Sequence, residues 1–526
     1  MSGSPRPHSE SYVDALLAVL ARPELPPART VLTTADRTVD ARSLRTGIHR
    51  AARLLAAHGV TRASTVALLT GNHPETLIAR YGANLLGARV VHLSPTAPAA
   101  ARARILEATA AVLLLVDPAT RELPTGTPEP LRLTLEPGLF TDDRPGRLPD
   151  RHTVRTPAAV RPEDDWCLRF TGGTTGPPKL VRLAHGPYRR ILAAHAAHIP
   201  SGAPARFLAC TTLAHLAGIV SDATLLAGGS VVLQEGFEPA AVLAAVERHR
   251  VTDLWLLPPL LHELLDHPDL ATTDVRALRR LFYGGTPASA ARLRRAAEVF
   301  GPVLHGSYGQ TETGPIAEVL PHEHVVTGPG GRVTAGRPLP GVDIEIRDPS
   351  GAVLPPGGTG EVHVRTPTAM SGYWGRPEPA AEVVRDGWAA TGDLGLLDGQ
   401  GYLHLVDRLK ETVIVVGAHL HPAEVEEVLH AHPAVARCAA FGIRAADGNE
   451  ELHVAVVPTP GRAPDAARLL ADFVTARLGT AYEPAAIHVM DRLPLTEAGK
   501  PDKVRLRSRF GGGAEEQARH APGPVG

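Results

Sequence analysis

Short apolar runs alternate with amphipathic stretches over much of the chain. The first runs lie at 66–70, 90–93 and 111–116, and the segments between them have the spacing of helices. The pattern resumes at 231–234, followed by a helix to Arg250, and continues at 253–257 and 281–283. Buried parallel strands have continuous apolar runs and alternate with the helices that cover them. We therefore expect an α/β fold with doubly wound sheets in a large N-terminal domain.

From about Gly341 the pattern changes to strands in which apolar and polar residues alternate, such as VDIEIR and EVHVR, separated by turn-rich stretches. This texture predicts a β-rich subdomain. After Gly401 we expect a small α+β domain, with strands at 412–416, near Cys438 and at 452–458 and helices at 422–431 and 466–478. The expected domains are 1–407 and 408–510, followed by a disordered tail at 511–526; the Pro-rich stretch 121–162 is expected to be a surface excursion.

Composition excludes several classes of protein. The 526 residues are 44% hydrophobic and 21% charged with a net charge of −1, and no basic stretch is interleaved with aromatics, so a nucleic-acid partner is not expected. No run approaches the ~18 apolar residues that span a bilayer, so no membrane partner is expected either. The three cysteines are widely separated, which fits reduced thiols and a cytoplasmic location.

Lysine is rare in this chain. Only four of its 54 basic residues are lysines, at 179, 410, 500 and 503, and all others are arginines. Lysine presents a compact ammonium group on a flexible stem, whereas arginine presents a planar fork. Each lysine is therefore a candidate for a specific role.

The segment FTGGTTGPPK (170–179) follows an expected strand and has the composition of a phosphate-binding loop. Its glycines let backbone amides approach a polyphosphate, its threonines add hydroxyl donors, and its lysine adds a charge. Lys179 follows Pro178 and precedes Leu180, so the segment is not a Walker loop. The alternative is a mobile Gly/Thr turn. The candidate residues are Thr171, Gly172, Gly173, Thr174, Thr175, Gly176 and Lys179.

Three further segments carry candidate chemistry. In GSYGQTE (306–312), Tyr308 could stack on adenine, Thr311 could bond the α-phosphate, and Glu312 is a candidate Mg²⁺ ligand; the alternative is a polar corner. TGDLG (391–395) and DRLKE (407–411) offer Asp393 and Arg408 for a ribose or a phosphate, or else are two hairpin turns.

The last segment, PLTEAGKPDK (494–503), presents Lys500 in a turn-rich loop. Its alternative interpretation is an exposed lysine near the end of the chain.

In this order and spacing, the four motifs resemble the adenylate-forming superfamily of acyl-CoA synthetases, peptide-synthetase adenylation domains and luciferases, over residues 40–505. The resemblance implies a mobile C-terminal domain and an active site between the domains. It implies that Lys500 bridges the carboxylate and the α-phosphate, that Glu312 carries Mg²⁺, and that Lys410 is the hinge. It also places His215 at the acid pocket, Asp393 and Arg408 at the ribose, and the adenine beside Tyr308 and Gly284, Gly285, Thr286 and Pro287.

The resemblance predicts an AMP-forming carboxylate ligase that uses ATP and Mg²⁺ and releases pyrophosphate. The chain is also similar to actinobacterial amide synthetases of the aminocoumarin-ligase type, which suggests an amine acceptor and antibiotic-type biosynthesis. The alternative acceptor is the thiol of coenzyme A. Apolar Ile414 and Val416 stand where many CoA ligases have lysines, which favours the amine.

The acid is expected to be small and aromatic, because no cation is evident in the sequence around His215 and LAGIV; a fatty acid is the alternative. A luciferase-like monooxygenase would use the same adenylate. A non-enzymatic ATP sensor would have little use for both Lys500 and Glu312. Two histidine pairs, His322 with His324 and His419 with His421, lack a third metal ligand and are interpreted as surface residues.

Overall fold

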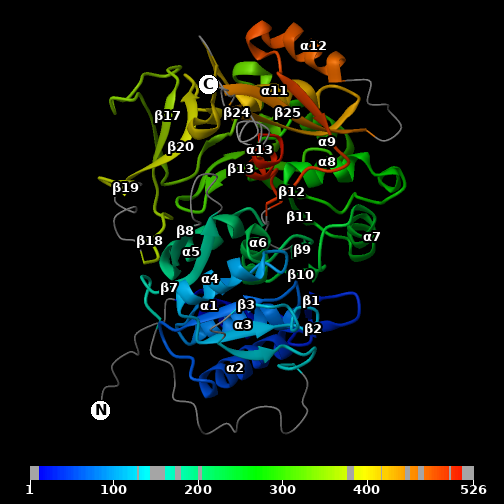
Figure 1. The fold of residues 1–526 in the computed structure, drawn as a ribbon. Coiled ribbons are helices and arrows are strands. Elements are labelled where there is room, and N and C mark those ends of the chain that lie inside the picture. The colour runs from blue at the N-terminus through cyan, green and yellow to red at the C-terminus, as the bar shows by residue number, and fades with distance from the viewer. Residues whose placement is uncertain are drawn as a thin grey trace, which may run out of the picture.

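The computed structural model describes residues 11–126, 130–141, 160–171, 179–199, 204–375, 384–415, 418–444, 450–459, 467–496 and 499–511. Figure 1 shows two large sheets with helices in the N-terminal part of the chain, a β-rich part beside them, and the C-terminal elements gathered at one end. No helix in these ranges is long and apolar enough to cross a membrane. All three cysteines are buried and unpaired, as expected.

A seven-stranded sheet has the order β18-β8-β7-β4-β3-β5-β6. Its parallel centre, β4-β3-β5, confirms the βαβαβ pattern, since α3 (Pro74–Leu85) and α4 (Ala99–Thr109) are the crossover helices. Every residue of β3 and β5 is buried, which explains their continuous apolar runs. The strands are β3 (Thr65–Leu69), β4 (Arg89–His92), β5 (Leu113–Val116), β6 (Leu131–Thr134), β7 (Asp165–Thr171), β8 (Lys179–Ala184) and β18 (Gly372–Tyr373).

The stretch 121–162 is more than the surface excursion that the sequence suggested. Residues 131–134 form the edge strand β6, which pairs in parallel with β5. Leu135 and Phe140 follow it and are buried in the core. The proline content therefore concealed a short strand and two buried apolar side chains; residues 127–129 and 142–159 lie outside the described residues.

A nine-stranded sheet has the order β15-β14-β13-β12-β11-β9-β10-β1-β2, in which β13, β12, β11, β9 and β10 run parallel. The strands are β1 (Thr30–Thr33), β2 (Thr38–Asp40), β9 (Arg206–Ala209), β10 (Ser230–Leu233), β11 (Asp253–Leu256), β12 (Arg280–Gly284), β13 (Leu304–Gln310), β14 (Gly314–Val319) and β15 (Arg337–Pro338). The helices between them are α5 (His185–Ala197), α6 (Leu216–Leu226), α7 (Pro239–His249), α8 (Pro258–Asp266), η1 (Pro268–Ala271), α9 (Ala290–Phe300), η2 (Pro321–Glu323) and η3 (Pro329–Gly331).

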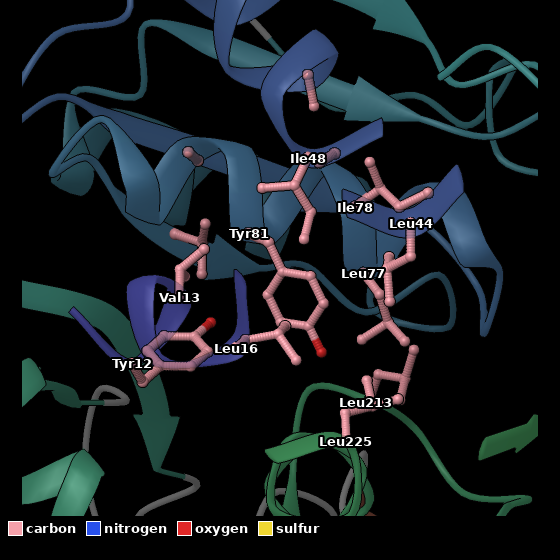
Figure 2. Close-up of a cluster of buried hydrophobic side chains, with 14 of the residues drawn as sticks. Tyr12, Val13, Leu16, Leu44, Ile48, Leu77, Ile78, Tyr81, Leu213 and Leu225 are labelled. Carbon is pink, nitrogen blue, oxygen red and sulfur yellow. The ribbon is translucent and has the colours of Figure 1, made fainter. Parts of the chain in front are cut away.

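The largest hydrophobic core joins the two sheets through α1 (Tyr12–Leu20), α2 (Ala41–Ala57), α3 and α6. Figure 2 shows Tyr12 and Leu16 of α1 beside Tyr81 of α3, with Leu213 and Leu225 entering from the α6 side. Within this core the Arg80 guanidinium pairs with Asp222, whose carboxylate also accepts bonds of 2.6 Å from the Tyr81 and Tyr188 hydroxyls. This buried charge is thus paired and hydrogen-bonded, as burial requires.

An antiparallel sheet confirms the β-rich subdomain. It consists of β16 (Asp343–Arg347), β17 (Gly360–Arg365), β19 (Val384–Arg385), β20 (Trp388–Leu397) and β21 (Leu403–Arg408).

The C-terminal part is the expected small α+β unit, with cores on both faces of the sheet β24-β25-β26. Its elements are η4 (Leu409–Glu411), β22 (Val413–Val415), β23 (Ala418–Leu420), α11 (Pro422–His430), β24 (Val435–Arg444), β25 (Glu450–Pro458), α12 (Ala467–Leu478), η5 (Thr480–Tyr482), β26 (Ala486–Val489) and α13 (Lys503–Gly511). Gly511 ends α13 rather than beginning the tail, and 512–526 lie outside the described residues.

Candidate active site

Asp393 lies where three strands bring polar side chains together. It is 5% exposed, and its backbone pairs with Arg408 across β20 and β21. Its Oδ2 accepts hydrogen bonds from the Tyr308 hydroxyl at 2.7 Å and the Gln310 amide at 2.8 Å, both on β13. The Arg408 Nε lies 3.2 Å from Oδ1. The carboxylate is therefore held in one orientation, which suits a ribose diol.

Tyr308 and Asp393 thus act as one unit, although the sequence assigned them separately to adenine and ribose. Burial and the Asp393 carboxylate raise the pKa of the Tyr308 phenol well above its usual value, so the phenol remains a donor. Adenine stacking on Tyr308 stays a prediction. Gln310 was missed, and its place two residues after Tyr308 on the same strand was the available signal.

Glu312 lies in the turn between β13 and β14, beside Thr311. The Glu312 Oε1 accepts a bond of 3.3 Å from the Tyr373 hydroxyl, and its backbone oxygen accepts one of 2.8 Å from Met370. The Lys179 Nζ lies 4.7 Å from the centroid of the same Tyr373 ring. Tyr373, on β18, therefore links the lysine of the first motif to the carboxylate of the second.

A divalent cation could use Glu312. No group of three His, Cys, Asp or Glu residues able to hold a metal occurs within the described ranges. Mg²⁺ does not need such a cage, because it is commonly held by one or two carboxylates together with substrate phosphates. A single carboxylate near Lys179, the candidate phosphate-binding lysine, fits that requirement.

Lys500 is brought to the same place from the C-terminal domain. A Cβ on Gly285, directly after β12, would lie 3.8 Å from Lys500 Cε. Burial and the Arg408 guanidinium lower the pKa of the Lys500 ammonium to about 8, while the Asp393, Glu411 and Glu312 carboxylates act in the opposite direction. The ammonium therefore faces the ribose and Mg²⁺ candidates, and it is not an exposed lysine near the end of the chain.

Gly499 allows this approach. Its φ of +76° lies in the region that favours glycine, and a Cβ there would come within 2.7 Å of Leu257 Cδ1 in the N-terminal domain. The loop that carries Lys500 therefore packs directly against the start of α8.

Three further contacts join the two domains. The Ala290 amide, at the start of α9, donates to Glu427 Oε1 of α11 at 3.0 Å. Arg437 of β24 forms an ion pair with Glu263 of α8. The rings of His262 and His430 are 5.6 Å apart in an edge-to-face arrangement. Together these contacts hold the C-terminal domain in the position that presents Lys500.

His215 immediately precedes α6 and makes no side-chain cap. Burial, with smaller contributions from Arg169 and Lys500, lowers its pKa to about 3, so the imidazole is neutral at pH 7. Arg169, on β7, is a cation that the sequence interpretation missed near His215. Its Nε is buried with no hydrogen-bond partner among the described residues.

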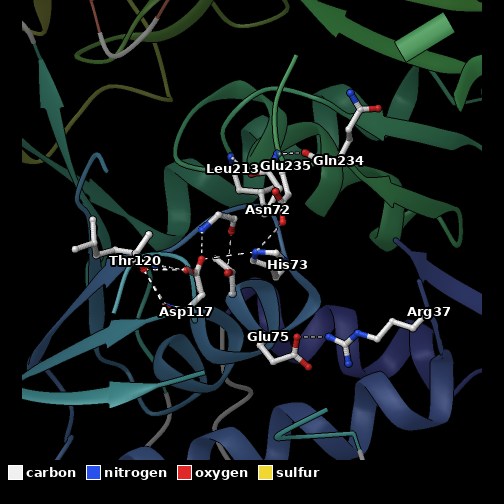
Figure 3. A network of polar contacts seen from close by, with 12 residues as sticks. Arg37, Asn72, His73, Glu75, Asp117, Thr120, Leu213, Gln234 and Glu235 are labelled. Carbon is white, nitrogen blue, oxygen red and sulfur yellow. Dashed lines mark hydrogen bonds and ion pairs between the residues drawn. The ribbon is translucent and has the colours of Figure 1, made fainter. Parts of the chain in front are cut away.

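Asn72 positions the loop that carries His215. Its amide nitrogen donates to the backbone oxygens of Thr211 at 2.8 Å and Gln234 at 2.9 Å, and its side-chain oxygen accepts from the Leu213 amide at 3.1 Å. Figure 3 shows Asn72 between the end of β3 and this loop, next to His73 and Asp117. A polar residue three positions after an apolar strand was the signal in the sequence, but its long-range partners were not visible there.

The remaining candidates divide into two groups. Gly284 ends β12, and Gly285, Thr286 and Pro287 follow it at the carboxyl edge of the sheet; the buried Thr286 hydroxyl has no partner among the described residues. Thr171 ends β7 and pairs with Lys179 at the start of β8. Gly172, Gly173, Thr174, Thr175 and Gly176 lie outside the described residues.

Lys410 is exposed in η4, the short segment that connects β21 to the C-terminal domain. Next to it, Glu411 forms an ion pair of 3.1 Å with Lys503, which also lies 2.9 Å from Glu426 of α11. The fourth lysine therefore fastens this segment to the C-terminal domain. A hinge at Lys410 stays a prediction.

The histidine pairs agree only in part with their interpretation as surface residues, since His322 and His419 are exposed but His324 and His421 are half-buried. The His324 Nε2 bonds the Tyr283 hydroxyl at 3.0 Å, and His421 precedes α11 with its Nδ1 3.8 Å from Asp407. Both rings are half-buried at element ends, where strand and helix packing covers them.

The chain matches two protein families. Residues 21–374 match the AMP-binding enzyme family, and residues 424–500 match the AMP-binding enzyme C-terminal domain. Feruloyl-CoA synthases from Amycolatopsis sp and Streptomyces sp are each 36% identical over 468 residues, which cover 88% of this chain and 92% of theirs.

Among solved structures, the amide bond synthetase McbA from Marinactinospora thermotolerans has a TM-score of 0.80 and 34% identity, covering 95% of this chain and 99% of its own. The anthranilate CoA ligase AuaEII, in complex with anthranoyl-AMP, has a TM-score of 0.82 and 25% identity, covering 97% and 99%. Relatives with amine and CoA acceptors are thus comparably similar.

Proposed function

The chain belongs to the family of AMP-binding enzymes, within the adenylate-forming superfamily, and on that premise we propose that it joins a small aromatic carboxylic acid to an amine through an acyl adenylate. The observation that carries this proposal is the position of Lys500 beside Gly285, among Arg408, Asp393 and Glu312. A lone structural lysine would have no reason to occupy a partly desolvated site of this kind.

In the first half-reaction, an oxygen of the carboxylate attacks the α-phosphorus of ATP, and the bond to the bridging oxygen of the β-phosphate breaks. The attack brings two anions together and concentrates charge around the phosphorus. The Lys500 ammonium would offset that charge between the carboxylate and the α-phosphate. Asp393, oriented by Tyr308 and Gln310, would hold the ribose.

Magnesium would lower the charge of the triphosphate when bound. Glu312 would hold it, together with the nucleotide phosphates, and Lys179 would contact those phosphates from β8. The loop 171–179 would supply further donors to them.

In the second half-reaction, the amine nitrogen attacks the acyl carbon, AMP leaves, and the nitrogen loses a proton. We expect Lys500 to leave the site first, by rotation of the C-terminal domain about Lys410. The amine acceptor is supported by the similarity to McbA and by Ile414, which is 58% exposed on β22 where a basic residue would favour CoA.

The alternative acceptor is the thiol of coenzyme A. It is supported by the similarity to the feruloyl-CoA synthases and to AuaEII. The names of these relatives, together with the neutral His215, also favour an aromatic acid. Arg169 weakens the earlier expectation of a wholly apolar pocket, so acids with a polar ring substituent belong among the substrates to test.

The first half-reaction is tested by acid-dependent exchange of pyrophosphate into ATP. In Lys500→Ala, the exchange should fall by about 10²-fold or more while ATP binding is retained, because the lost charge acts mainly in the transition state. Lys410→Ala should retain exchange and lose overall product formation. Unchanged exchange in Lys500→Ala would refute the assignment.

The acceptor is tested separately. Aryl and alkyl acids are each offered an amine or CoA, and the products are identified by mass spectrometry. Formation of an amide supports the proposal. Formation of a thioester without any amide would show instead that the protein is a CoA ligase.

A further inference from the structure

A groove of about 550 Å³ lies on the C-terminal domain, between α13 and the segment that follows β26. Its walls combine apolar side chains with three arginines. The lining residues are Met490, Arg492, Leu493, Pro494, Leu495, Arg505 and Arg509. None of them is a candidate residue of the active site.

The groove has unbalanced positive charge. Arg505 and Arg509 are four residues apart on α13, so their side chains lie on the same face of the helix and repel each other. Arg492 faces them from the opposite wall, and no carboxylate lines the groove. None of the three guanidinium groups forms an ion pair with any described residue.

The nearest acidic residue on α13's side does not relieve this repulsion. Asp502 precedes the helix, and its Oδ1 accepts the backbone amide of Arg505 at 3.0 Å. This bond caps the helix and leaves the guanidinium of Arg505 exposed. Nearby, the Arg509 guanidinium lies 5.4 Å from the centroid of the Phe510 ring.

We propose that this groove is a second anion site, separate from the nucleotide site, which binds a ligand carrying two or more phosphate groups. Guanidinium groups bind phosphate oxygens with charge-assisted bonds, often in pairs, and three of them match a multiply charged anion better than a single carboxylate. The apolar walls formed by Met490, Leu493 and Leu495 can cover a flat organic part of the ligand.

The groove is connected to the loop that carries Lys500. Pro494 and Leu495 line the groove and also begin that loop, which is closed by a bridge between Leu495 and Pro501 and by a bond of 2.8 Å from the Asp502 amide to the Pro494 oxygen. A ligand in the groove would therefore contact the base of the loop that carries Lys500.

Two sources offer the required chemistry. One is pyrophosphate, the product of the first half-reaction. The other is the adenosine 3′,5′-bisphosphate portion of a CoA acceptor. Both are multiply charged phosphates, and they differ in the presence of an aromatic base that could lie against the apolar walls.

The proposal is tested by calorimetric titration of the full chain with pyrophosphate and, separately, with adenosine 3′,5′-bisphosphate. The wild type should bind at least one of them at a site beyond the nucleotide site. The double variant R505Q/R509Q should lose that site, with affinity reduced by about tenfold or more, because two charge-assisted contacts are removed. The control Arg468→Gln changes an exposed arginine on α12 of the same domain and should bind like the wild type.

Tighter binding of the bisphosphate would identify the ligand of the groove as the nucleotide portion of a CoA acceptor. Tighter binding of pyrophosphate would identify it as the product of the first half-reaction. Equal stoichiometry and affinity in all three proteins would overturn the proposal. Equally tight binding of sulfate would also overturn it, since charge alone would then suffice. Pyrophosphate exchange is measured on the same samples, so a failure of the second site is distinguished from a failure of adenylation.

Discussion

The ammonium group of Lys500 lies in a partly desolvated site, where burial and the Arg408 guanidinium lower its pKa to about 8. The first half-reaction needs this group protonated, so the active form is lost as the pH rises through that value. We expect kcat/KM for pyrophosphate exchange to fall above about pH 8, since kcat/KM reports the free enzyme. The corresponding fall in kcat (the basic limb of its pH profile) should occur at higher pH, because bound ATP stabilises the ammonium cation.

The control is Lys500→Arg, whose guanidinium does not lose its proton in this range. Pyrophosphate exchange in this variant should be slower than in the wild type, and its kcat/KM should not fall above about pH 8. A limb that stays near pH 8 in this variant would assign the titration to another group.

Asn72 shows what a sequence conceals at the scale of one residue. The motif residues could be named because their chemistry stands in short segments, as with Asp393, Glu312 and Lys500. Asn72, Gln310 and Tyr373 were missed, because each acts through a partner that is distant in sequence or on another strand. Arg169 was missed because only the fold brings it near His215. Residue type identified the charges, and only the fold supplied the groups that orient them.

At the scale of elements, strands that are buried on both faces were predictable, because their apolar runs are continuous, as in β3 and β5. The antiparallel strands after Gly341 were predictable from alternation. The edge strand β6 was not, since a four-residue strand with one exposed and three half-buried residues carries little pattern. The pairing of β18 with β8, which brings Tyr373 to Lys179, is equally absent from local sequence.

The link between η4, α11 and α13 depends on Lys503. Its Nζ lies 3.1 Å from Glu411 and 2.9 Å from Glu426, and these carboxylates hold its pKa above the usual value despite burial. In Lys503→Met two largely buried carboxylates lose their partner, which costs about 3–5 kcal/mol. Hydrogen exchange at the amides of β24 and β25 should accelerate by about 10²-fold or more if the domain opens as a unit.

Lys503→Arg retains the charge and should restore most of the protection. Equal protection in the methionine variant and the wild type would show that the ion pairs do not stabilise this domain. Because the pairs bind Glu411 to the C-terminal domain, we also expect Lys503→Met to slow overall product formation more than pyrophosphate exchange.

At the scale of the whole molecule, the contacts between the domains hold Lys500 where the proposed first half-reaction needs it. Glu427 accepts the Ala290 amide at the start of α9, Arg437 pairs with Glu263, and Gly499 packs on Leu257. A ligand or contact can shift a two-state equilibrium only by its preference for one state. The proposed rotation of the C-terminal domain would break these contacts as Lys500 leaves the site, so we expect them to favour adenylation over transfer.

Removing them should therefore separate the half-reactions. In Glu427→Ala/Arg437→Ala, the loss of two partly buried contacts of about 1 kcal/mol each should lower the closed population, so pyrophosphate exchange slows by about tenfold. Transfer from a preformed acyl adenylate, followed in a single turnover, should keep its rate or accelerate. The matched control Arg444→Ala/Glu483→Ala alters two exposed residues of the same domain and should change neither step. If both steps slowed equally, the contacts would serve the stability of the domain and not its position, because a shift between two arrangements must affect the two half-reactions differently.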